Sequence, residues 1–441
     1  MSVLDTPAQG VATPAAVGPV TGPAGKSATR SLLELALVVA AVVALSVATG
    51  QVALLIVVAC IIVIVMVHEL GHLLAAKHGN MKVTEYFLGF GPRLWSFRRG
   101  ETEYGVKAIP LGGYVKIPGM TNLEEVAPED EARTYREQPF HARLLVAVAG
   151  SAMHFLMAFV LMWVLVTFVG LPNDAKVGVQ QVVTVGGRSG PAQVAGLRSG
   201  DVLVSVAGRP VRGNPTVFID EIESHPGVPV ALVVSRSGVD RPFTVVPVNG
   251  RTVHEAGVTR PPGTKPFGLV GVGLGTPTER VGPLAGLQRT GSNLVRYTWA
   301  TLGGVAHLFS PSAAVQRFDE VTSAKAASQA DKNGTRAQSV VGIVQVGQDA
   351  FHAGIAPLLL LLIAINIGFG ILNMLPMLPL DGGHVAIALY EKIRTGRSKV
   401  RYRADAAKLL PYAGAFMAFL VVLVATTVLA DLVHPMANPF G

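Results

Sequence analysis

The chain has 441 residues, half of them apolar and only 15% charged. Soluble globular domains carry about a quarter charged residues, so this composition argues against a soluble protein. The net charge of +8 does not indicate a nucleic-acid partner, because the basic residues gather beside long apolar runs, as cytoplasmic positive charge does in membrane proteins. The composition predicts a polytopic α-helical membrane protein in contact with the lipid bilayer.

The N-terminal stretch, residues 1–30, is rich in Pro, Ala, Gly and Thr and lacks the apolar core of a secretory signal peptide. We expect a disordered cytoplasmic tail, because such a segment has little apolar surface to bury. Lys26 and Arg30 precede the first apolar run and favour a cytoplasmic start. The only cysteine, Cys60, lies inside that run, which excludes an internal disulfide.

Four apolar runs cover residues 32–67, 144–171, 355–380 and 409–433. The first has 36 residues and would make a helix of about 54 Å, longer than one crossing of about 30 Å of hydrocarbon. Thr49-Gly50-Gln51 near its middle favours a turn between two spans, 32–48 and 52–76. One long kinked helix is the alternative, so we expect four or five transmembrane helices.

Positive charge sets the expected topology. Seven basic residues lie between Glu391 and Lys408 inclusive, a density typical of a cytoplasmic loop or of a contact with anionic lipid. A cytoplasmic N-terminus and five spans place this loop and residues 77–143 inside, and residues 172–354 outside. The expected location is the plasma membrane.

The loop after the second span contains a predicted β-hairpin. Residues 101–120 are rich in Tyr, Val and Ile around a Gly112-Gly113 bend, a hairpin pattern. The aromatic and Gly-rich stretch 87–95 is expected to dip into the membrane interface. Residues 31–171 thus form an N-terminal membrane part, and residues 355–435 a C-terminal one.

Residues 172–250 have the composition of an inserted α/β domain, with short β-branched segments between turn signals. A strand, a short helix and GLRSGDVLVSVAGRPV follow one another, a layout that resembles a protease-associated PDZ domain. Ala195-Gly196-Leu197 and Gly200-Asp201 carry this resemblance, which implies binding of a chain end at a sheet edge. A plain spacer domain is the alternative. Residues 251–354 are expected to be a linker, polar over 319–338, with an amphipathic interfacial helix at 292–309.

The first apolar block ends in His68-Glu69-Leu70-Gly71-His72. Residues four apart share one helix face, so the two histidines can present imidazoles to one metal ion. Glu69, about 100° around the helix, can act as a general base without ligating. The alternative is a pair of interfacial histidines without a metal, but ionisable side chains at membrane depth usually mark function.

A catalytic zinc site needs a third protein ligand and an open position for water. The run ILNMLPMLPLDGGH, residues 371–384, ends an apolar span and holds one carboxylate, Asp381, the first candidate; His384 is the second. An N-cap role is the alternative for Asp381. Asn373 in the same run is expected to bind the substrate backbone or the oxyanion.

HELGH at 68–72 together with NMLPMLPLDGG at 373–383 resembles the site-2 protease family of intramembrane zinc metalloproteases, over about residues 52–435. Residues 87–114 also resemble the family's membrane-dipping β-segment. The resemblance implies one zinc ion per chain, held by His68, His72 and Asp381, with Glu69 as catalytic base and acid. It further implies a single-span substrate, an anti-sigma factor already trimmed by an upstream site-1 protease.

The sequence departs from the family at one place. Where many relatives have Gly-Pro-x-x-Asn-Phe, this chain has Gly150-Ser-Ala-Met-His154-Phe155. His154 is expected either to bind a substrate backbone group or to lie beside the metal. Two other classes of function compete with the protease, a catalytically silent scaffold that uses its PDZ domain and a metal transporter.

Overall fold

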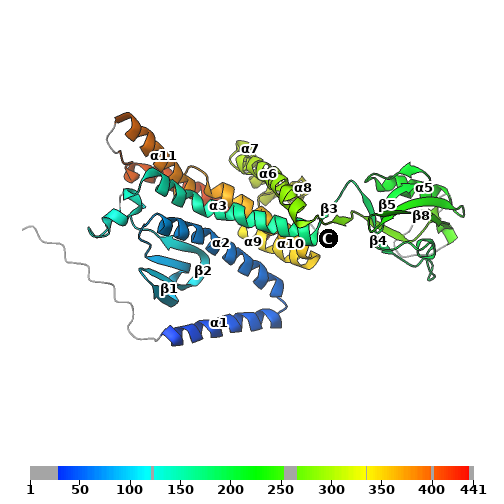
Figure 1. Ribbon diagram of the computed structural model, residues 1–441, viewed down its shortest axis with the longest axis horizontal. Coiled ribbons are helices and arrows are strands. Elements are labelled where there is room, and N and C mark those ends of the chain that lie inside the picture. Colours follow the sequence, from blue (N-terminus) through cyan, green and yellow to red (C-terminus); the bar gives the residue numbers. More distant parts are fainter. Residues whose placement is uncertain (1–27, 121–123, 253–265, 334, 399–401, 437–441) are drawn as a thin grey trace, which may run out of the picture.

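The computed structural model describes residues 28–120, 124–252, 266–333, 335–398 and 402–436. Figure 1 shows a helical membrane part from which a small β-rich domain projects. The helices of the described residues are α1 (Ala28–Ala48), α2 (Val52–His78), α3 (Phe140–Val164), α4 (Pro191–Val194), α5 (Pro215–Ser224), α6 (Pro283–Leu308), α7 (Pro311–Thr322), α8 (Ala324–Asn333), α9 (Val340–Ala353), α10 (Ile355–Asn373), α11 (Asp381–Ser398) and α12 (Leu410–Val433).

The strands are short apart from the first two. They are β1 (Glu85–Arg99), β2 (Thr102–Lys116), β3 (Leu171–Pro172), β4 (Val177–Val182), β5 (Val202–Val206), β6 (Arg209–Pro210), β7 (Val230–Arg236), β8 (Val239–Val245), β9 (Val248–Asn249), β10 (Gly268–Leu269), β11 (Val272–Gly275) and β12 (Thr278–Glu279).

Five helices of the described chain are long and apolar enough to cross a membrane, namely α1, α2, α3 with its π-helical extension to Val169, α10, and α12 with the turn before it. The first apolar run contains two helices, as predicted, and the alternative of one kinked helix is wrong. Gly50 sits between them with φ of +70°, a conformation that glycine adopts without steric cost. The tail expected over residues 1–27 lies outside the described residues, and 28–30 already belong to α1.

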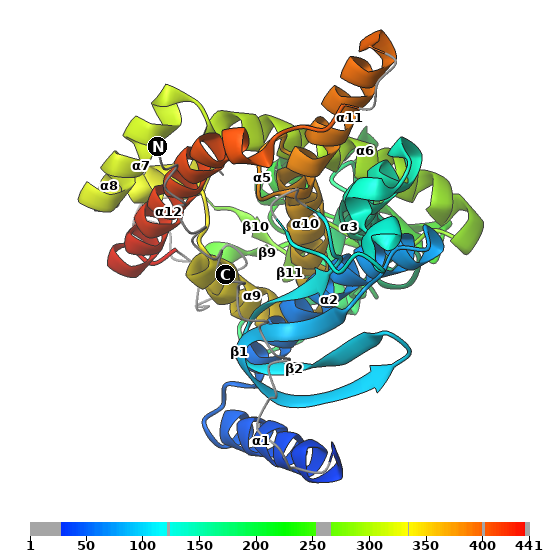
Figure 2. The same cartoon turned by 90° about the vertical axis from the view of Figure 1, so that its left-hand side faces the viewer.

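The helices α2, α3 and α10 form the centre of the membrane part. Figure 2 looks at the molecule from the left-hand side of Figure 1 and shows α2, α3 and α10 next to one another, while α12 lies apart from them. Small residues allow the closest approach: a Cβ on Gly71 of α2 would lie 2.6 Å from the carbonyl oxygen of Ala149 on α3. Two apolar clusters, around Met162 and Ile363 and around Val57 and Leu362, pack α10 against its neighbours.

The β-hairpin exists, but its turn is not where the sequence suggested. The strands β1 and β2 meet at Gly100-Glu101, and Gly112-Gly113 lies inside β2. Gly100, with φ of +65°, makes the tight turn, and the stretch expected to dip into the interface forms the partner strand. Because β2 bends, Glu85–Leu88 pairs with 103–106 on one side and with 113–116 on the other. The sheet lies between α1 and α2 (Figures 1 and 2).

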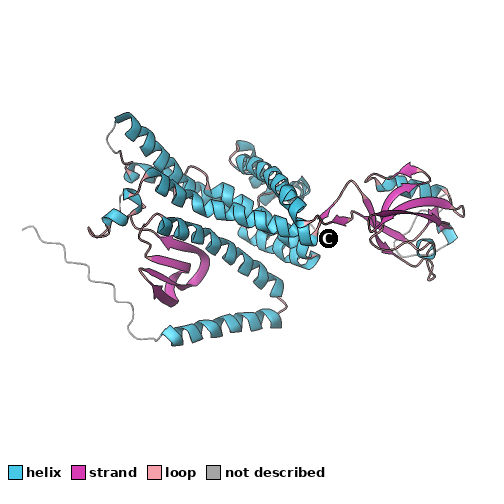
Figure 3. Cartoon of the chain, in the orientation of Figure 1, coloured by secondary structure: helices cyan, strands magenta, loops and turns pink. Residues whose placement is uncertain are grey.

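The projecting domain is built on an antiparallel sheet of order β11-β4-β5-β7-β8, with β6 beside β5 (Figure 3). Its core includes Val206, Phe218, Leu232 and Val234. The edge strand β11 comes from the range expected to be linker, as do β10 and β12. The sequence of β11 did not predict a strand, because it is rich in glycine, which has low β-propensity. The domain joins the membrane part where β3 pairs with β12.

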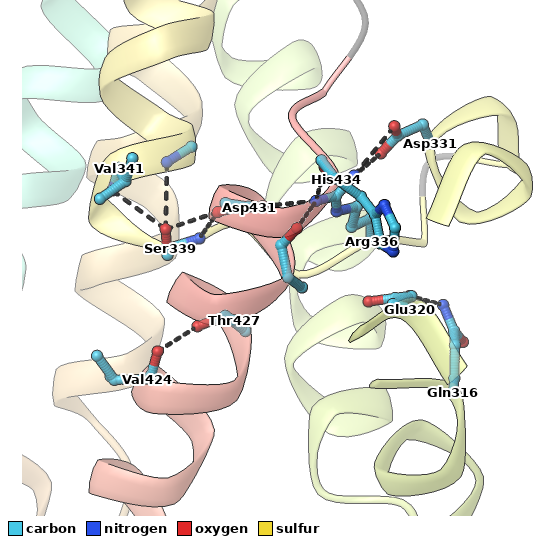
Figure 4. Close-up of polar contacts among 12 residues, drawn as sticks. Gln316, Glu320, Asp331, Arg336, Ser339, Val341, Val424, Thr427, Asp431 and His434 are labelled. Atoms are coloured by element: carbon cyan, nitrogen blue, oxygen red, sulfur yellow. Dashed lines mark hydrogen bonds and ion pairs between the residues drawn. The ribbon is translucent and has the colours of Figure 1, made fainter. Parts of the chain in front are cut away.

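The segment between this domain and α10 is mostly helical. The amphipathic helix expected at 292–309 is part of the longer α6. The stretch 319–338 is not simply a polar linker, since α7 and α8 cover much of its described part. Arg336, with 1% of its side chain exposed, donates to Asp431 near the end of α12. Ser339 donates to the same carboxylate through its backbone and its hydroxyl, so this network fixes α12 to the start of α9 (Figure 4).

Candidate metal centre

The two motif histidines lie near the C-terminal end of α2. His68 and His72 are both buried, and their Nε2 atoms lie 3.2 Å apart. The helical spacing therefore brings the two imidazoles together, as the sequence predicts.

Asp381 completes the group from a distant part of the chain. Its Oδ2 atom lies 3.4 Å from Nε2 of His68 and 3.3 Å from Nε2 of His72. The span α10 ends at Asn373, the chain turns through 374–380, and α11 begins at Asp381 itself. Gly382 permits this tight turn, because a Cβ there would lie 2.3 Å from the carbonyl oxygen of Met374.

These three donor atoms fit a zinc ion. Tetrahedral zinc with bonds of about 2.0–2.1 Å places its ligand atoms about 3.3–3.4 Å apart, and the three measured separations are 3.2, 3.3 and 3.4 Å. Among the described residues, Oδ2 of Asp381 is buried without a hydrogen-bond partner, which is costly unless a cation faces it. Two histidines and one carboxylate are also a donor set typical of catalytic zinc.

The helix α3 orients the ligands through its backbone. Nδ1 of His72 lies 2.8 Å from the carbonyl oxygen of Val146. Since a carbonyl only accepts, Nδ1 carries the proton and Nε2 is free to ligate. Gly150, one turn further along, lies against both rings, because a Cβ there would be 2.4 Å from Nε2 of His72 and from Cε1 of His68.

Glu69 lies next to this group without belonging to it. It is half-buried and is not one of the three clustered ligands. Its side chain faces β2: Cγ is 3.5 Å from the position of a Cβ on Gly113. The carboxylate also interacts electrostatically with His72 and Asp381. It therefore borders the ligands on the side where β2 approaches.

The structure adds a polar contact that the sequence analysis missed. His154 is buried beside His68, with 4.8 Å between ring centroids, and its Nδ1 lies 3.1 Å from Oδ1 of Asn366. Asn366 is fully buried in α10 and donates to the carbonyl of Leu362. An amide inside an otherwise apolar span is the signal that could have revealed it.

The remaining candidates lie outside the ligand group. His384, the second candidate for third ligand, packs edge-on against Tyr135 with 6.1 Å between centroids and is not in the cluster. Asn373 is the last residue of α10 and is half-buried. The structure thus favours Asp381 over His384 as the ligand that completes the site.

Two buried histidines on a membrane span and a half-buried aspartate shortly after another span, bordered by a glutamate, define a membrane-embedded zinc metallohydrolase. The family model for peptidase family M50 matches residues 56–421, and the chain belongs to this family, the site-2 proteases. It is an intramembrane zinc metalloprotease, rather than a scaffold or a metal transporter.

Curated relatives agree with this assignment. The chain is 34% identical over 396 residues to zinc metalloprotease Rip1 of Mycobacterium tuberculosis, covering 85% of this chain and 96% of the relative. Rip1 of Mycolicibacterium smegmatis is also 34% identical, over 86% of this chain and 96% of its own length. A putative zinc metalloprotease of Nostoc is 30% identical over 78% of this chain and 87% of its own length.

Proposed function

We propose that this protease cleaves a transmembrane segment of a single-span protein, an anti-sigma factor that a site-1 protease has first trimmed outside the cell. The observation that carries the proposal is the position of the ligands: His68 and His72 lie on a membrane span, and Asp381 follows another. A site enclosed by spans suits a substrate that is itself in the membrane.

Glu69 is the proposed general base and acid. A bound zinc ion would polarise the scissile carbonyl and lower the pKa of a water molecule. Glu69 takes a proton from the attacking water and returns it to the leaving amine. Asn373, where α10 ends before the loop to Asp381, is proposed to hold the substrate backbone.

The hairpin is proposed to hold the unwound substrate. The backbone amides of a helix are hydrogen-bonded within the helix, so the scissile segment must be extended before a nucleophile can attack it. Residues 113–116 of β2 pair with β1 on one side, and the backbone of Val115 on the other side faces Glu69. A strand added at this edge would lie beside the general base. The exposed side chains of Phe90, Phe97 and Ile109 support association of the hairpin with the membrane.

The projecting domain is proposed to be PDZ-like and extracytoplasmic. A cavity of about 350 Å³ lies between α5 and residues 268–274, with Phe218, Ile222 and Val272 in its wall. The strand β11 beside it is at the edge of the sheet. An extended chain end can add to such an edge and place its last side chain in the cavity. We further propose a plasma-membrane location with a cytoplasmic N-terminus, which is the membrane topology expected from the distribution of basic residues.

The projecting domain is also proposed to act as a filter that excludes substrate whose external part has not been trimmed, and the structure permits a test of this role. Asn173 donates to the carbonyl of Pro277 at a distance of 3.0 Å, so residues 174–276 can be replaced by a short Gly-Ser linker between ends that already touch. We expect the deletion variant to cleave an untrimmed single-span substrate that the wild type leaves intact. If the variant still requires prior trimming, the filter proposal fails, while cleavage of a trimmed substrate by both proteins tests the protease activity separately.

A further inference from the structure

A second cavity, of about 380 Å³, lies between α11 and the start of α12. This volume falls within the range of about 300–1,000 Å³ common for small-molecule sites. None of the three metal ligands lines it, so it is separate from the catalytic site. Its wall is made by Pro376, Met377, Leu378, Gly383, Ala386, Ile387, Tyr390, Tyr402, Ala404, Asp405, Lys408, Leu409, Tyr412 and Ala413.

The cavity lies at the level where a membrane span begins. The candidate span that contains α12 starts at Ala407, and its first turns supply one wall. Leu410 and Tyr412 are 55% and 69% exposed, so an apolar and an aromatic side chain face outward there. Tyrosine is enriched at the membrane–water interface, and Tyr390 and Tyr402 also line the cavity. This depth is where acyl chains meet headgroups.

Basic side chains lie beside the cavity. The guanidinium of Arg394 lies over Tyr402 and Tyr390, at 5.0 and 5.9 Å from the ring centroids. Lys408, in the cavity wall, has 83% of its side chain exposed and lies 3.9 Å from the carboxylate of Asp405, which also lines the cavity. Residues 381–413 contain seven basic residues and three acidic ones. Of the basic ones, Lys399 and Arg401 lie outside the described residues, and Arg403 pairs with Glu137.

One of the three acidic residues, Glu391, already has other hydrogen-bond partners. Glu391 accepts from Arg143 of α3 at 2.5 Å and from the backbone of Ala404. In the cavity wall, the exposed ammonium of Lys408 is the group that can face an anionic headgroup.

We propose that this cavity binds one acyl chain of an anionic phospholipid of the inner leaflet, with the headgroup held by Lys408 of the cavity wall. The cavity wall includes Pro376–Leu378, part of the loop that carries the chain from α10 to Asp381. A bound acyl chain would pack against this loop from the side away from the metal ligands. The lipid thereby supports the segment that positions the third ligand.

The test measures lipid binding directly, so it does not depend on cleavage of any substrate. Full-length protein in detergent is titrated with phosphatidylglycerol and with phosphatidylcholine of the same acyl chains, and bound lipid is counted by native mass spectrometry. We expect wild type to bind phosphatidylglycerol at least fivefold more tightly. Ala386→Phe and Ala413→Phe fill the cavity from opposite walls and should weaken binding of this lipid about tenfold.

Charge reversal provides the matched comparison. Lys408→Glu should remove the preference for phosphatidylglycerol, whereas Lys332→Glu, at an exposed position of α8, should leave it unchanged. Equal binding of the two lipids by wild type, or unchanged binding in both cavity-filling variants, would overturn the proposal. If either filling variant fails to fold, the comparison of the two lysine variants decides alone. Displacement of the lipid by a transmembrane substrate peptide, one for one, would assign the cavity to substrate instead.

Discussion

His72 places its Nδ1 atom 2.8 Å from the backbone carbonyl oxygen of Val146, so the backbone of α3 fixes the orientation of a candidate metal ligand on α2. Groups that orient ligands in this way commonly change metal affinity 10- to 100-fold when they are disturbed. The separation of α2 and α3 is therefore as important to the site as the ligands themselves.

Gly150→Ala tests this dependence. A Cβ at this position would lie 2.4 Å from both imidazoles, so the two helices would have to separate or the rings would have to turn. We expect zinc affinity to fall about 10- to 100-fold, measured by competition with a chelator. Gly303→Ala on α6, where a Cβ meets nothing within 4 Å, is the matched control and should bind zinc as wild type does. Equal affinity in the two variants would contradict the assigned packing.

Asp381→Ala distinguishes the two candidates for the third ligand. Because Asp381 lies within 3.4 Å of both imidazoles and His384 lies outside the group, loss of Asp381 should abolish stable zinc binding. His384→Ala should retain about one zinc per chain. Metal analysis after gel filtration checks both variants, and a reversed outcome would make His384 the ligand.

The buried pair of Arg336 and Asp431 should be essential for stability. Their side chains are 1% and 0% exposed, so Arg336→Met leaves a carboxylate buried without its cation. Such a loss costs about 3–5 kcal/mol, and the free energy of unfolding in detergent measures it. Arg209→Met removes an exposed partner of Glu221 and should cost less than about 1 kcal/mol. Similar losses in both variants would show that the buried pair does not hold α12 in place.

The projecting domain should lose stability in acid through Asp201. Burial alone would raise the pKa of Asp201, but Arg236 donates to both of its carboxylate oxygens and, with the backbone of Arg198, holds this pKa below its usual range. The unfolded carboxyl has a pKa near 3.9. A lowered folded pKa therefore contributes stability that is fully present above about pH 5 and is lost as the pH falls through the folded pKa.

Hydrogen exchange in β5 and β7, corrected for the intrinsic effect of pH, checks this prediction. Protection should fall between pH 6 and pH 3 in wild type. In Asp201→Asn it should be lower at pH 6 and change less with pH. The same pH dependence in both proteins would exclude Asp201 as the cause.

The sequence predicted those features that local periodicity determines. Two histidines four residues apart on a helix must share a face, and Asp381 was the only carboxylate in its apolar run, so the ligand group could be foreseen. The strand β11 could not, because glycines occupy half of its four positions and its pairing with β4 is non-local. The turn of the hairpin was misplaced because Gly100 and Gly112-Gly113 offer similar local signals. The contact of His154 with Asn366 joins residues 212 positions apart, which no local pattern encodes.

The most direct test of the central claim compares Glu69→Gln with wild type, both purified in detergent. Zinc content and cleavage of a trimmed single-span substrate are measured on the same samples. Because Glu69 borders the ligand group without belonging to it, the variant should keep about one zinc per chain and lose cleavage by at least a hundredfold. If the variant cleaves as fast as wild type, or if wild type binds no zinc, the assigned catalytic site is wrong.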